Sequence, residues 1–314
     1  MATPTNTPVN PASDAGDAGH DRLTRFLLQA AGVRGVHVQL DETWARIRER
    51  AGDDVPAAVT ELLGEAAVAA ALFTGHAKVD GRLSVQFRGD GPLRTLFAEC
   101  TAAGTLRGIA QVKPDGTPLP RDLRALGADA VLAITIENPG GAGREPVRYQ
   151  GLVALESESL AGAFEGYFHQ SEQLPTRLLL AADGHRAAGL MLQKLPGDGG
   201  DDDGWDRACA LFETLSPAEL LAAPATTLLW RLFHEDGAEV LGARPLRFAC
   251  SCSRDRVAAM LQSLGEDEAR AATAAGDAEI RCEFCGEQYR FDLDEIMALF
   301  PAGSVAVEAP ERLQ

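Results

Sequence analysis

The pattern of apolar and polar residues divides the chain into a strand-rich part and a helix-rich part. Up to about residue 195, short segments alternate between apolar and polar residues and are separated by glycine and proline turns, a pattern typical of half-buried β-strands. The strands predicted in this way are 35–40, 83–87, 93–99, 106–112, 131–137, 147–155, 176–182 and 188–194. We interpret the run from 83 to 155 as an antiparallel sheet.

Three helices are predicted within the same part of the chain. Asp41 is a candidate N-cap for a helix through Arg50, and another helix is expected over 160–173. Residues 55–75 are apolar on nearly all sides, which is typical of a helix buried in a core. This segment comes closest to a membrane-spanning run, but it is interrupted by Glu61 and Glu65, so we expect no membrane segment.

Helical periodicity dominates after an acidic, glycine-rich hinge at 196–204. Helices are predicted over 205–215 and 226–233, and the tetrad Ser216-Pro217-Ala218-Glu219 between them is a capping box with proline at the first helical position. So small a segment cannot bury its apolar residues alone, and we expect it to pack against a neighbour. These residues are Trp205, Leu211, Phe212, Leu228, Leu229, Trp230 and Phe233.

The last part of the sequence, from about Arg244, predicts a small mixed domain. Its first helix follows the amphipathic spacing of Val257, Met260, Leu261 and Leu264 and stops at Gly265. A short helix over 266–275, strands over 279–281 and 288–291, and a helix from Asp292 to Phe300 follow.

These patterns together predict an α+β protein. A chain of 314 residues is long enough for two domains and a sizeable core. We predict a disordered tail (1–20), an N-terminal α+β domain built on an antiparallel sheet with helices (21–195), a hinge and helical linker (196–243), a small C-terminal zinc-binding domain (244–300) and a second tail (301–314).

Four of the six cysteines gather in the C-terminal part, as the C-x-C pair Cys250 and Cys252 and the C-x-x-C pair Cys282 and Cys285. The chain between the pairs is long enough to form a helix or two and return. Two close thiol pairs that meet suit the tetrahedral, sulfur-rich coordination of Zn²⁺. We therefore predict one zinc ion bound by these four cysteines.

The same sulfurs can also form disulfides. A bond between residues two apart, as in C-x-C, closes a small strained ring, and strained disulfides suit reversible switching. The metal site and the redox site are therefore two states of one set of sulfurs. Cys100 and Cys209 stand alone in apolar sequence, and we interpret them as core residues.

Charge and motifs narrow the function classes. The net charge is −17, and residues 244–299 carry seven arginines against eleven acidic residues, a balance that disfavours nucleic-acid binding. We find no phosphate-binding glycine loop, G-x-S-x-G motif or metalloprotease helix, and therefore predict no enzyme activity. The first residues lack the basic and apolar regions of a signal peptide, so we expect a cytoplasmic protein. The acidic hinge at 196–204 lacks the full pattern of a calcium-binding loop, and we interpret it as a solvated loop.

Several motifs resemble the heat shock protein 33 family, the 33 kDa redox-regulated chaperonins. The most specific is Phe-x-Cys-x-Cys-Ser, starting at Phe248, followed after about thirty residues by Cys-Glu-Phe-Cys-Gly-x-x-Tyr-x-Phe, starting at Cys282. The stretches 81–87, 91–96 and 106–108 agree with it. The resemblance extends over roughly residues 21–299.

The resemblance implies an ATP-independent holdase that binds unfolding client proteins under oxidative stress. It implies that the reduced cysteines hold zinc, that Cys250 then pairs with Cys252 and Cys282 with Cys285 on oxidation, and that zinc is released. It also implies a metastable helical linker and a homodimer of the oxidised form, with no nucleic-acid or membrane partner. It identifies no client-binding residue in this chain.

Three other functions remain open on the residues alone. A thiol–disulfide oxidoreductase would use the C-x-x-C pair, but Cys282 does not open a helix after a buried strand. A zinc-ribbon module that binds nucleic acid is opposed by the acidic balance of its segment. A structural zinc domain on an enzyme of unknown type would leave activity independent of the redox state.

Overall fold

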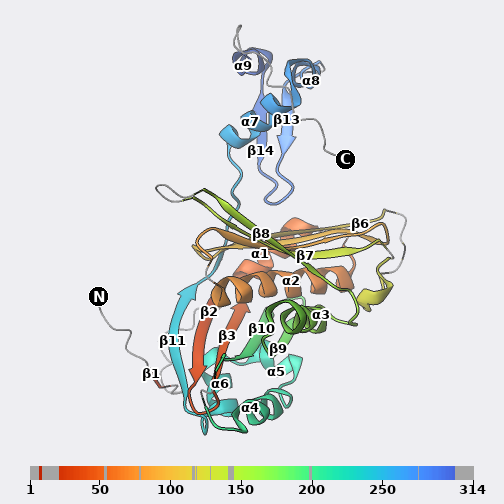
Figure 1. The fold of residues 1–314 in the computed structure, drawn as a ribbon. Coiled ribbons are helices and arrows are strands. Elements are labelled where there is room, and N and C mark those ends of the chain that lie inside the picture. Colours follow the sequence, from red (N-terminus) through yellow and green to blue (C-terminus); the bar gives the residue numbers. More distant parts are fainter. Residues whose placement is uncertain are drawn as a thin grey trace. The chain divides into compact units, whose positions relative to one another are not determined.

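The computed structural model describes residues 7–8, 21–52, 55–77, 79–114, 117, 119–127, 129–140, 145–197, 200–274 and 276–300. The chain forms two compact units, Met1–Ala249 and Cys250–Gln314. Within its described residues, the first unit holds two six-stranded sheets with helices (Figure 1). The predicted α+β class is confirmed. The tails predicted over 1–20 and 301–314 lie outside the described residues, apart from strand β1 (Thr7–Pro8).

The first sheet, called sheet A, has the strand order β1–β11–β2–β3–β10–β9, with every neighbouring pair antiparallel. Its longer strands are β11 (Ala238–Pro245), β2 (Arg22–Leu28), β3 (Val33–Leu40), β10 (Ala187–Lys194) and β9 (Thr176–Ala182).

Strands β2 and β11 are missing from the prediction, and they pair with each other. Residues 238–243 form most of β11, where the sequence predicts the end of a helical linker, so that part of the linker prediction is wrong. The alternation of β11 is interrupted at Leu241, between Val240 and Gly242, where its register against β2 shifts by one residue. Residues 244–249, which the sequence assigns to the C-terminal domain, belong to the first unit in the structure.

The second sheet, called sheet B, has the strand order β12–β6–β5–β4–β7–β8. Its strands are β12 (Arg247–Phe248), β6 (Thr105–Val112), β5 (Leu93–Thr101), β4 (Arg82–Arg88), β7 (Val131–Asn138) and β8 (Val147–Val153). Short strand β12 runs parallel to β6, and the other neighbouring pairs are antiparallel.

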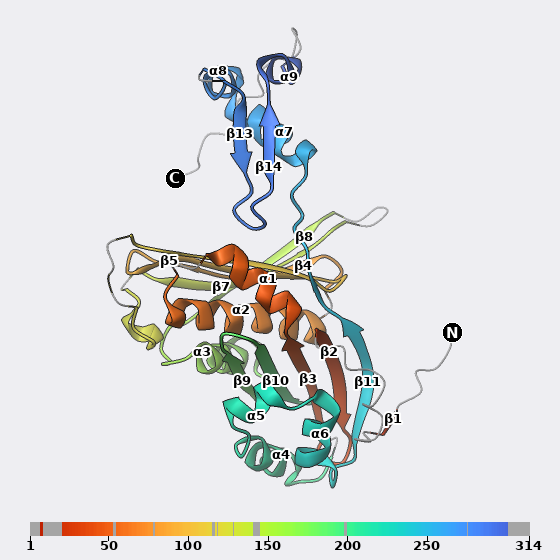
Figure 2. The same cartoon turned by 180° about the vertical axis from the view of Figure 1, so that it is seen from behind.

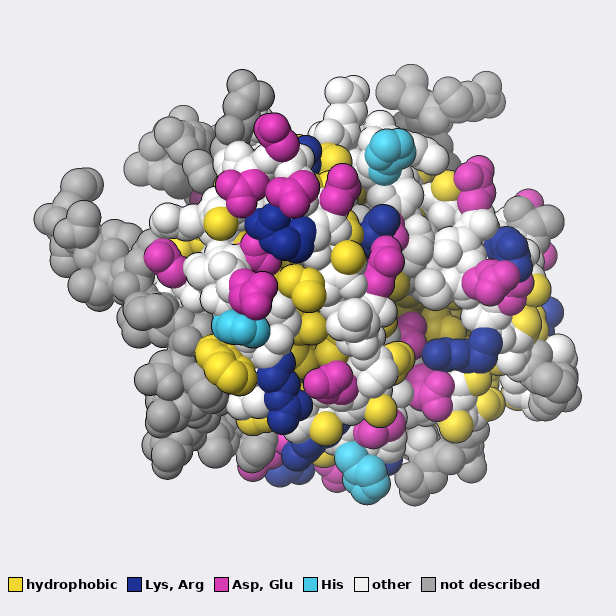
Figure 3. All heavy atoms as spheres, turned by 90° about the horizontal axis from the view of Figure 1, so that it is seen from below, with side chains coloured by type: hydrophobic (Ala, Val, Ile, Leu, Met, Phe, Trp, Pro, Cys, Tyr) yellow, Lys and Arg dark blue, Asp and Glu magenta, His cyan; other side chains and the backbone are white. Residues whose placement is uncertain are grey.

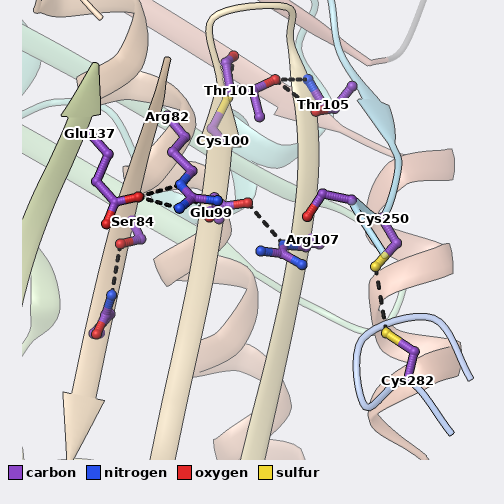
Figure 4. A network of polar contacts seen from close by, with 12 residues as sticks. Arg82, Ser84, Glu99, Cys100, Thr101, Thr105, Arg107, Glu137, Cys250 and Cys282 are labelled. Atoms are coloured by element: carbon purple, nitrogen blue, oxygen red, sulfur yellow. Dashed lines mark hydrogen bonds and ion pairs between the residues drawn. The ribbon is translucent and has the colours of Figure 1, made fainter. Parts of the chain in front are cut away.

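A row of alternating charges crosses sheet B. The row runs from β6 to β8 through Arg107, Glu99, Arg82, Glu137 and Arg148, of which the first four are labelled in Figure 4. The Nε atom of Arg107 lies 2.9 Å from a carboxylate oxygen of Glu99, which is nearly fully buried. Because opposite charges on neighbouring strands stabilise one pairing over a slipped one, the row fixes the register of the sheet.

Helix α2 (Ala57–His76) lies between the two sheets and contacts strands of both (Figure 1). By length and composition it is apolar enough to span a membrane, but 78% of its most apolar stretch is buried inside the protein. Alanines fill much of its middle, which lets both sheets approach the helix closely. The prediction of a buried core helix is confirmed.

Two predicted helices differ in detail. Helix α1 (Glu42–Ala51) follows Asp41 as expected, but the Asp41 side chain does not cap it. The carboxylate of Asp21 accepts hydrogen bonds from the backbone N–H groups of Asp41 and Thr43 instead, at 2.8 and 3.0 Å. Helix α3 (Leu160–Tyr167) is shorter than predicted, because the chain continues as one π-helical turn over Phe168–Glu172.

Three short helices cover the face of sheet A that points away from α2 (Figure 2). We call α4 (Gly204–Phe212), α5 (Pro217–Ala222) and α6 (Ala225–Phe233) the helical layer. Phe212, Leu229 and Phe233 of the layer are buried in an apolar core shared with sheet A, which confirms that these helices pack on a neighbour. Trp230 differs from this, since it is 42% exposed and stacks on His234.

The outer surface of the helical layer carries mixed charges. In the view from below, acidic and basic side chains lie side by side on this face (Figure 3). Arg207 of α4 forms ion pairs with Asp201 at 3.3 Å, with Asp203 at 2.9 Å and with Asp236 at 2.6 Å. Asp236 is almost completely buried, so this arginine links the start of the layer to the chain that leaves it.

The close approach of α2 to strand β10 gives a testable prediction. A Cβ atom added at Gly189 would overlap with Cγ1 of Val68 and lie 2.8 Å from Cδ1 of Leu72, both on α2. We expect Gly189→Ala to lower the free energy of unfolding by about 1–3 kcal/mol, because core overpacking forces side chains from their preferred positions. The measurement is the urea midpoint at unchanged m-value.

The matched control is Gly166→Ala in helix α3, where an added Cβ meets no atom within 4 Å. This variant should be neutral or stabilising by about 0.5–1 kcal/mol, since alanine favours a helix. Equal midpoints for the two variants would contradict the packing argument.

Candidate metal centre

The second unit is small and has little apolar core. It contains α7 (Arg254–Leu264), α8 (Glu266–Ala271), the hairpin β13 (Ala278–Arg281) and β14 (Gln288–Phe291), and α9 (Leu293–Ala298). Among its described residues, the buried apolar side chains that form its core are Leu261, Ala269, Ala278, Phe291 and Ile296. A core of this size stabilises a fold weakly. A domain this small usually needs a further cross-link, such as a bound metal ion or a disulfide.

The β13–β14 hairpin positions one cysteine pair at its turn. The backbone N–H of Cys282 donates to the carbonyl of Glu287 at 2.8 Å, which extends the ladder by one pair. The N–H of Gly286 then donates to the carbonyl of Cys282, also at 2.8 Å. Gly286 has φ of +71°, a conformation that favours glycine. The turn therefore presents Cys282 and Cys285 from a backbone held by its own hydrogen bonds.

The other cysteine pair lies in the segment that leads into α7. The hydroxyl of Ser253 caps this helix by accepting from the N–H of Arg256 at 3.2 Å. The Arg256 guanidinium donates to the carbonyl of Ser251, between the two cysteines, at 2.8 Å. Local hydrogen bonds thus fix the approach of Cys250 and Cys252.

The structure brings the four predicted cysteines together. Their sulfur atoms all lie within 4.8 Å of one another. The shortest approaches join the two pairs, with 3.6 Å from Cys250 to Cys282 (Figure 4) and 3.3 Å from Cys252 to Cys285. Zn–S bonds of 2.3 Å in a tetrahedron place sulfurs about 3.8 Å apart. These four atoms could hold a metal ion, and a set of four thiols suits zinc.

The two remaining cysteines lie outside this cluster. Cys100 and Cys209 are both buried in the first unit. Burial raises the pKa of the Cys100 thiol to about 11, so it stays protonated and unreactive. The interpretation of both as core residues is confirmed by their burial.

The surroundings of Cys285 oppose its ionisation when no cation is bound. Burial raises the pKa of the Cys285 thiol above its ordinary value, and hydrogen bonds to neighbouring thiols act in the same direction. A divalent cation reverses this balance, because metal binding stabilises thiolates and releases their protons. The cluster is therefore chemically suited to exchange protons for a metal ion.

Tyr289 of strand β14 is a further residue of the site that the motif analysis does not assign. Its hydroxyl donates to the sulfur of Cys252 at 3.1 Å, and this hydrogen bond is the main cause of a raised pKa for the tyrosine. The signal in the sequence is the position of Tyr289 four residues after Cys285, on the strand that leaves the cysteine turn.

Comparisons with known proteins agree in one family. A family model described as Hsp33 protein matches residues 21–292. A protein named 33 kDa chaperonin from Ectopseudomonas mendocina is 42% identical over 93% of this chain and 99% of its own length. Another of that name from Cronobacter sakazakii is 39% identical over 90% and 96%.

A solved structure is similar in fold. The crystal structure of the 33 kDa chaperonin (heat shock protein 33 homolog) from Thermotoga maritima matches with a TM-score of 0.71 and 22% identity. The match covers 89% of this chain and 97% of the other.

The hydrogen bond from Tyr289 leads to a prediction for metal affinity. We expect Tyr289→Phe to weaken Zn²⁺ binding by about tenfold, because hydrogen bonds to ligand atoms orient them and typically contribute 10–100-fold to affinity. Competition with a chromogenic chelator under anaerobic, reducing conditions measures this change. Tyr149→Phe, which removes a hydroxyl bonded to Tyr167 in the first unit, is the control and should bind zinc as the unmodified protein does. Equal affinities in both variants would contradict the assigned role.

Proposed function

The chain belongs to the Hsp33 family, whose relatives carry the name 33 kDa chaperonin, and we propose that it is a redox-regulated, ATP-independent holdase. In this proposal the protein binds unfolding client proteins under oxidative stress, after its thiols are oxidised and zinc is released. The names of the relatives support the chaperone function. The observation that carries the redox part is the gathering of four thiols in a unit with a very small apolar core.

In the reduced state, Cys250, Cys252, Cys282 and Cys285 would hold the metal ion. A bound Zn²⁺ would supply a tie between two chain segments, worth on the order of 10–16 kcal/mol in small zinc domains. The five buried apolar residues of the unit cannot replace such a contribution. The four thiolates therefore act as ligands and as the main source of stability in the second unit.

In the oxidised state, Cys250 would pair with Cys252 and Cys282 with Cys285. Each disulfide would form as two zinc-bound thiolates lose two electrons to one hydrogen peroxide, which takes up two protons from solvent and becomes two waters. These bonds join neighbours within each pair and leave no covalent link between the segments. The opposite pairing competes, because Cys252 and Cys285 lie 3.3 Å apart in the reduced form. A Cys252–Cys285 bond would preserve the tie, so the switch depends on which pairs form.

The helical layer is the proposed source of the client-binding surface. Release of α4–α6 would expose Phe212, Leu229 and Phe233 together with the apolar face of sheet A that they cover. The core of this layer is made entirely of residues of the first unit. Metal loss alone leaves those contacts in place, so we propose that a second stress such as heat is needed to release the layer. A homodimer of the oxidised form and a cytoplasmic location remain part of the proposal.

The first test couples three measurements in one oxidation experiment. We expect hydrogen peroxide at elevated temperature to release about one Zn²⁺ per chain, read with a chromogenic chelator, as suppression of client aggregation appears. Disulfide mapping by mass spectrometry should find Cys250–Cys252 and Cys282–Cys285, and reductant with zinc should reverse all three changes.

Two thiol variants sharpen this test. Cys252→Ala should bind zinc weakly and lose its dependence on oxidant, whereas Cys209→Ala, which removes a buried thiol from the first unit, should switch normally. Zinc release without any gain of client binding, or disulfides that link the two pairs, would contradict the proposal.

The second test concerns the ion pairs of Arg207. Asp236→Asn should loosen the helical layer by about 2 kcal/mol, less than the roughly 3–5 kcal/mol of a fully buried pair, because Arg207 is one-third exposed. We expect faster proteolysis over α4–α6 in the reduced protein and holdase activity at a lower temperature. Asp203→Asn removes an exposed partner of the same arginine and should change stability by about 0–1 kcal/mol. Similar effects from both variants would refute a role for the buried pair.

A further inference from the structure

One histidine is buried where the helical layer packs on sheet A. His37 of β3 lies opposite Leu190 of β10 and opposite Thr24 of β2. Residues directly opposite each other on neighbouring strands share a face of the sheet. Leu190 belongs to the apolar core that sheet A shares with the helical layer, so His37 faces α4–α6 and not α2. His37 is only 1% exposed.

The environment of His37 does not stabilise a positive charge. Its Nε2 atom is buried and has no hydrogen-bond partner among the described residues. Burial lowers the pKa of His37 to about 4. The imidazole is therefore neutral at pH 7, and a proton added to it would leave an unpaired charge in an apolar core. An unpaired buried charge favours any conformation in which water reaches it.

Sheet A places cations, and no carboxylate, on the face that His37 shares. By the strand registers, the charged residues described on this face are Arg22 of β2, Lys194 of β10 and Arg177 of β9. None of the described strand residues on it is an aspartate or a glutamate. Because like charges disfavour a further positive charge, the sheet does not stabilise a protonated His37.

The titratable groups of the helical layer do not compensate that charge either. Its buried carboxylate, Asp236, is paired with Arg207 at 2.6 Å. Glu219 forms a partly exposed ion pair with an arginine of α6, and the remaining carboxylates and His234 between residues 201 and 235 are exposed. Burial raises the pKa of the Cys209 thiol, so this buried thiol is uncharged.

We propose that protonation of His37 releases the helical layer, so that acid acts on the first unit without oxidation of any cysteine. In the released layer the imidazole is hydrated and takes up a proton at an ordinary pKa of about 6.5. The closed layer therefore loses stability as the pH falls below about 6.5, and the loss is complete near pH 4. The consequence for client binding rests on the proposed function, whereas the opening itself does not.

Other groups that titrate in this range act elsewhere or in the opposite direction. Nε2 of His76, near the end of α2, lies 3.0 Å from Nη2 of Arg34, and burial and this charge lower the pKa of His76 to about 4. His76 contacts the other face of sheet A, so its protonation would loosen α2 and not the layer. Burial raises the pKa of Asp21, Glu65 and Glu165, so protonation of these carboxylates favours the folded state.

The test is hydrogen exchange of the reduced, zinc-loaded full chain between pH 7.5 and 5.0 at constant ionic strength. Protection factors over α4–α6, which correct for the pH dependence of intrinsic exchange, measure how often the layer opens. Relative to pH 7.5, we expect opening to increase about tenfold at pH 5.5 and about thirtyfold at pH 5.0. Protection that stays constant, or that falls no more over the layer than over sheet B, overturns the proposal.

Two variants remove the titrating group, and two are controls. His37→Gln and His37→Leu should each lose most of the acid dependence, and the second keeps the test decisive if the first fails to fold. His76→Gln, and His185→Gln in the exposed turn between β9 and β10, should open in acid as the unmodified protein does. Zinc lost at low pH is lost from all four variants alike. Acid opening that persists without His37, or that disappears in His76→Gln, overturns the proposal.

Client aggregation measured in the same samples separates this proposal from the proposed function. Acid opening of the layer together with suppressed aggregation supports both. Acid opening without any suppression supports the role of His37 and contradicts the proposed function. A layer that stays protected in acid, in a protein that suppresses aggregation after oxidation, contradicts the role of His37 alone.

Discussion

The burial of helix α2 on all sides is the constraint on which the first unit depends. The helix is apolar around its whole circumference, so it cannot lie on a surface and must be enclosed. Its run of alanines lets sheet A and sheet B pack against opposite sides of one thin element. One face of each sheet therefore packs against the helix. The outer face of sheet B carries the row of alternating charges, together with exposed apolar side chains such as Val131 and Leu152. The outer face of sheet A is apolar and is covered by the helical layer.

The two regions linked to function are stabilised by different interactions. The helical layer rests on an apolar core and on the buried ion pair between Arg207 and Asp236. The second unit has few buried apolar side chains. Its four cysteine sulfurs come from two segments far apart in the sequence and lie within 4.8 Å of one another. Oxidants act on sulfurs, whereas heat and ionic conditions act on apolar contacts and ion pairs. Under the proposed function, an oxidant would therefore act on the second unit and heat on the helical layer of the first.

The features that the sequence predicts have local signals, and those that it misses depend on distant partners. The all-apolar run of α2 and the cysteine spacing are visible within short windows, and the structure agrees with both. The cap of α1 comes from Asp21, twenty residues before Asp41, which no local pattern reveals. The alternation of strand β11 is interrupted by its bulge at Leu241, and its partner β2 lies near the other end of the unit in the sequence. The unpaired nitrogen of His37 becomes visible only when its neighbours are placed around it.

Strand β11 also determines how tension travels along the chain. It begins five residues after α6 ends and finishes just before the second unit, and it is hydrogen bonded to β2 from Ala238 to Pro245. Ladder hydrogen bonds lie across the strand direction, so a pull along β11 must stretch many of them together. A protease machine that engages the C-terminus would therefore unravel the second unit and then meet a mechanical clamp. The helical layer precedes that clamp in the chain, so it would stay folded after the second unit has been unravelled.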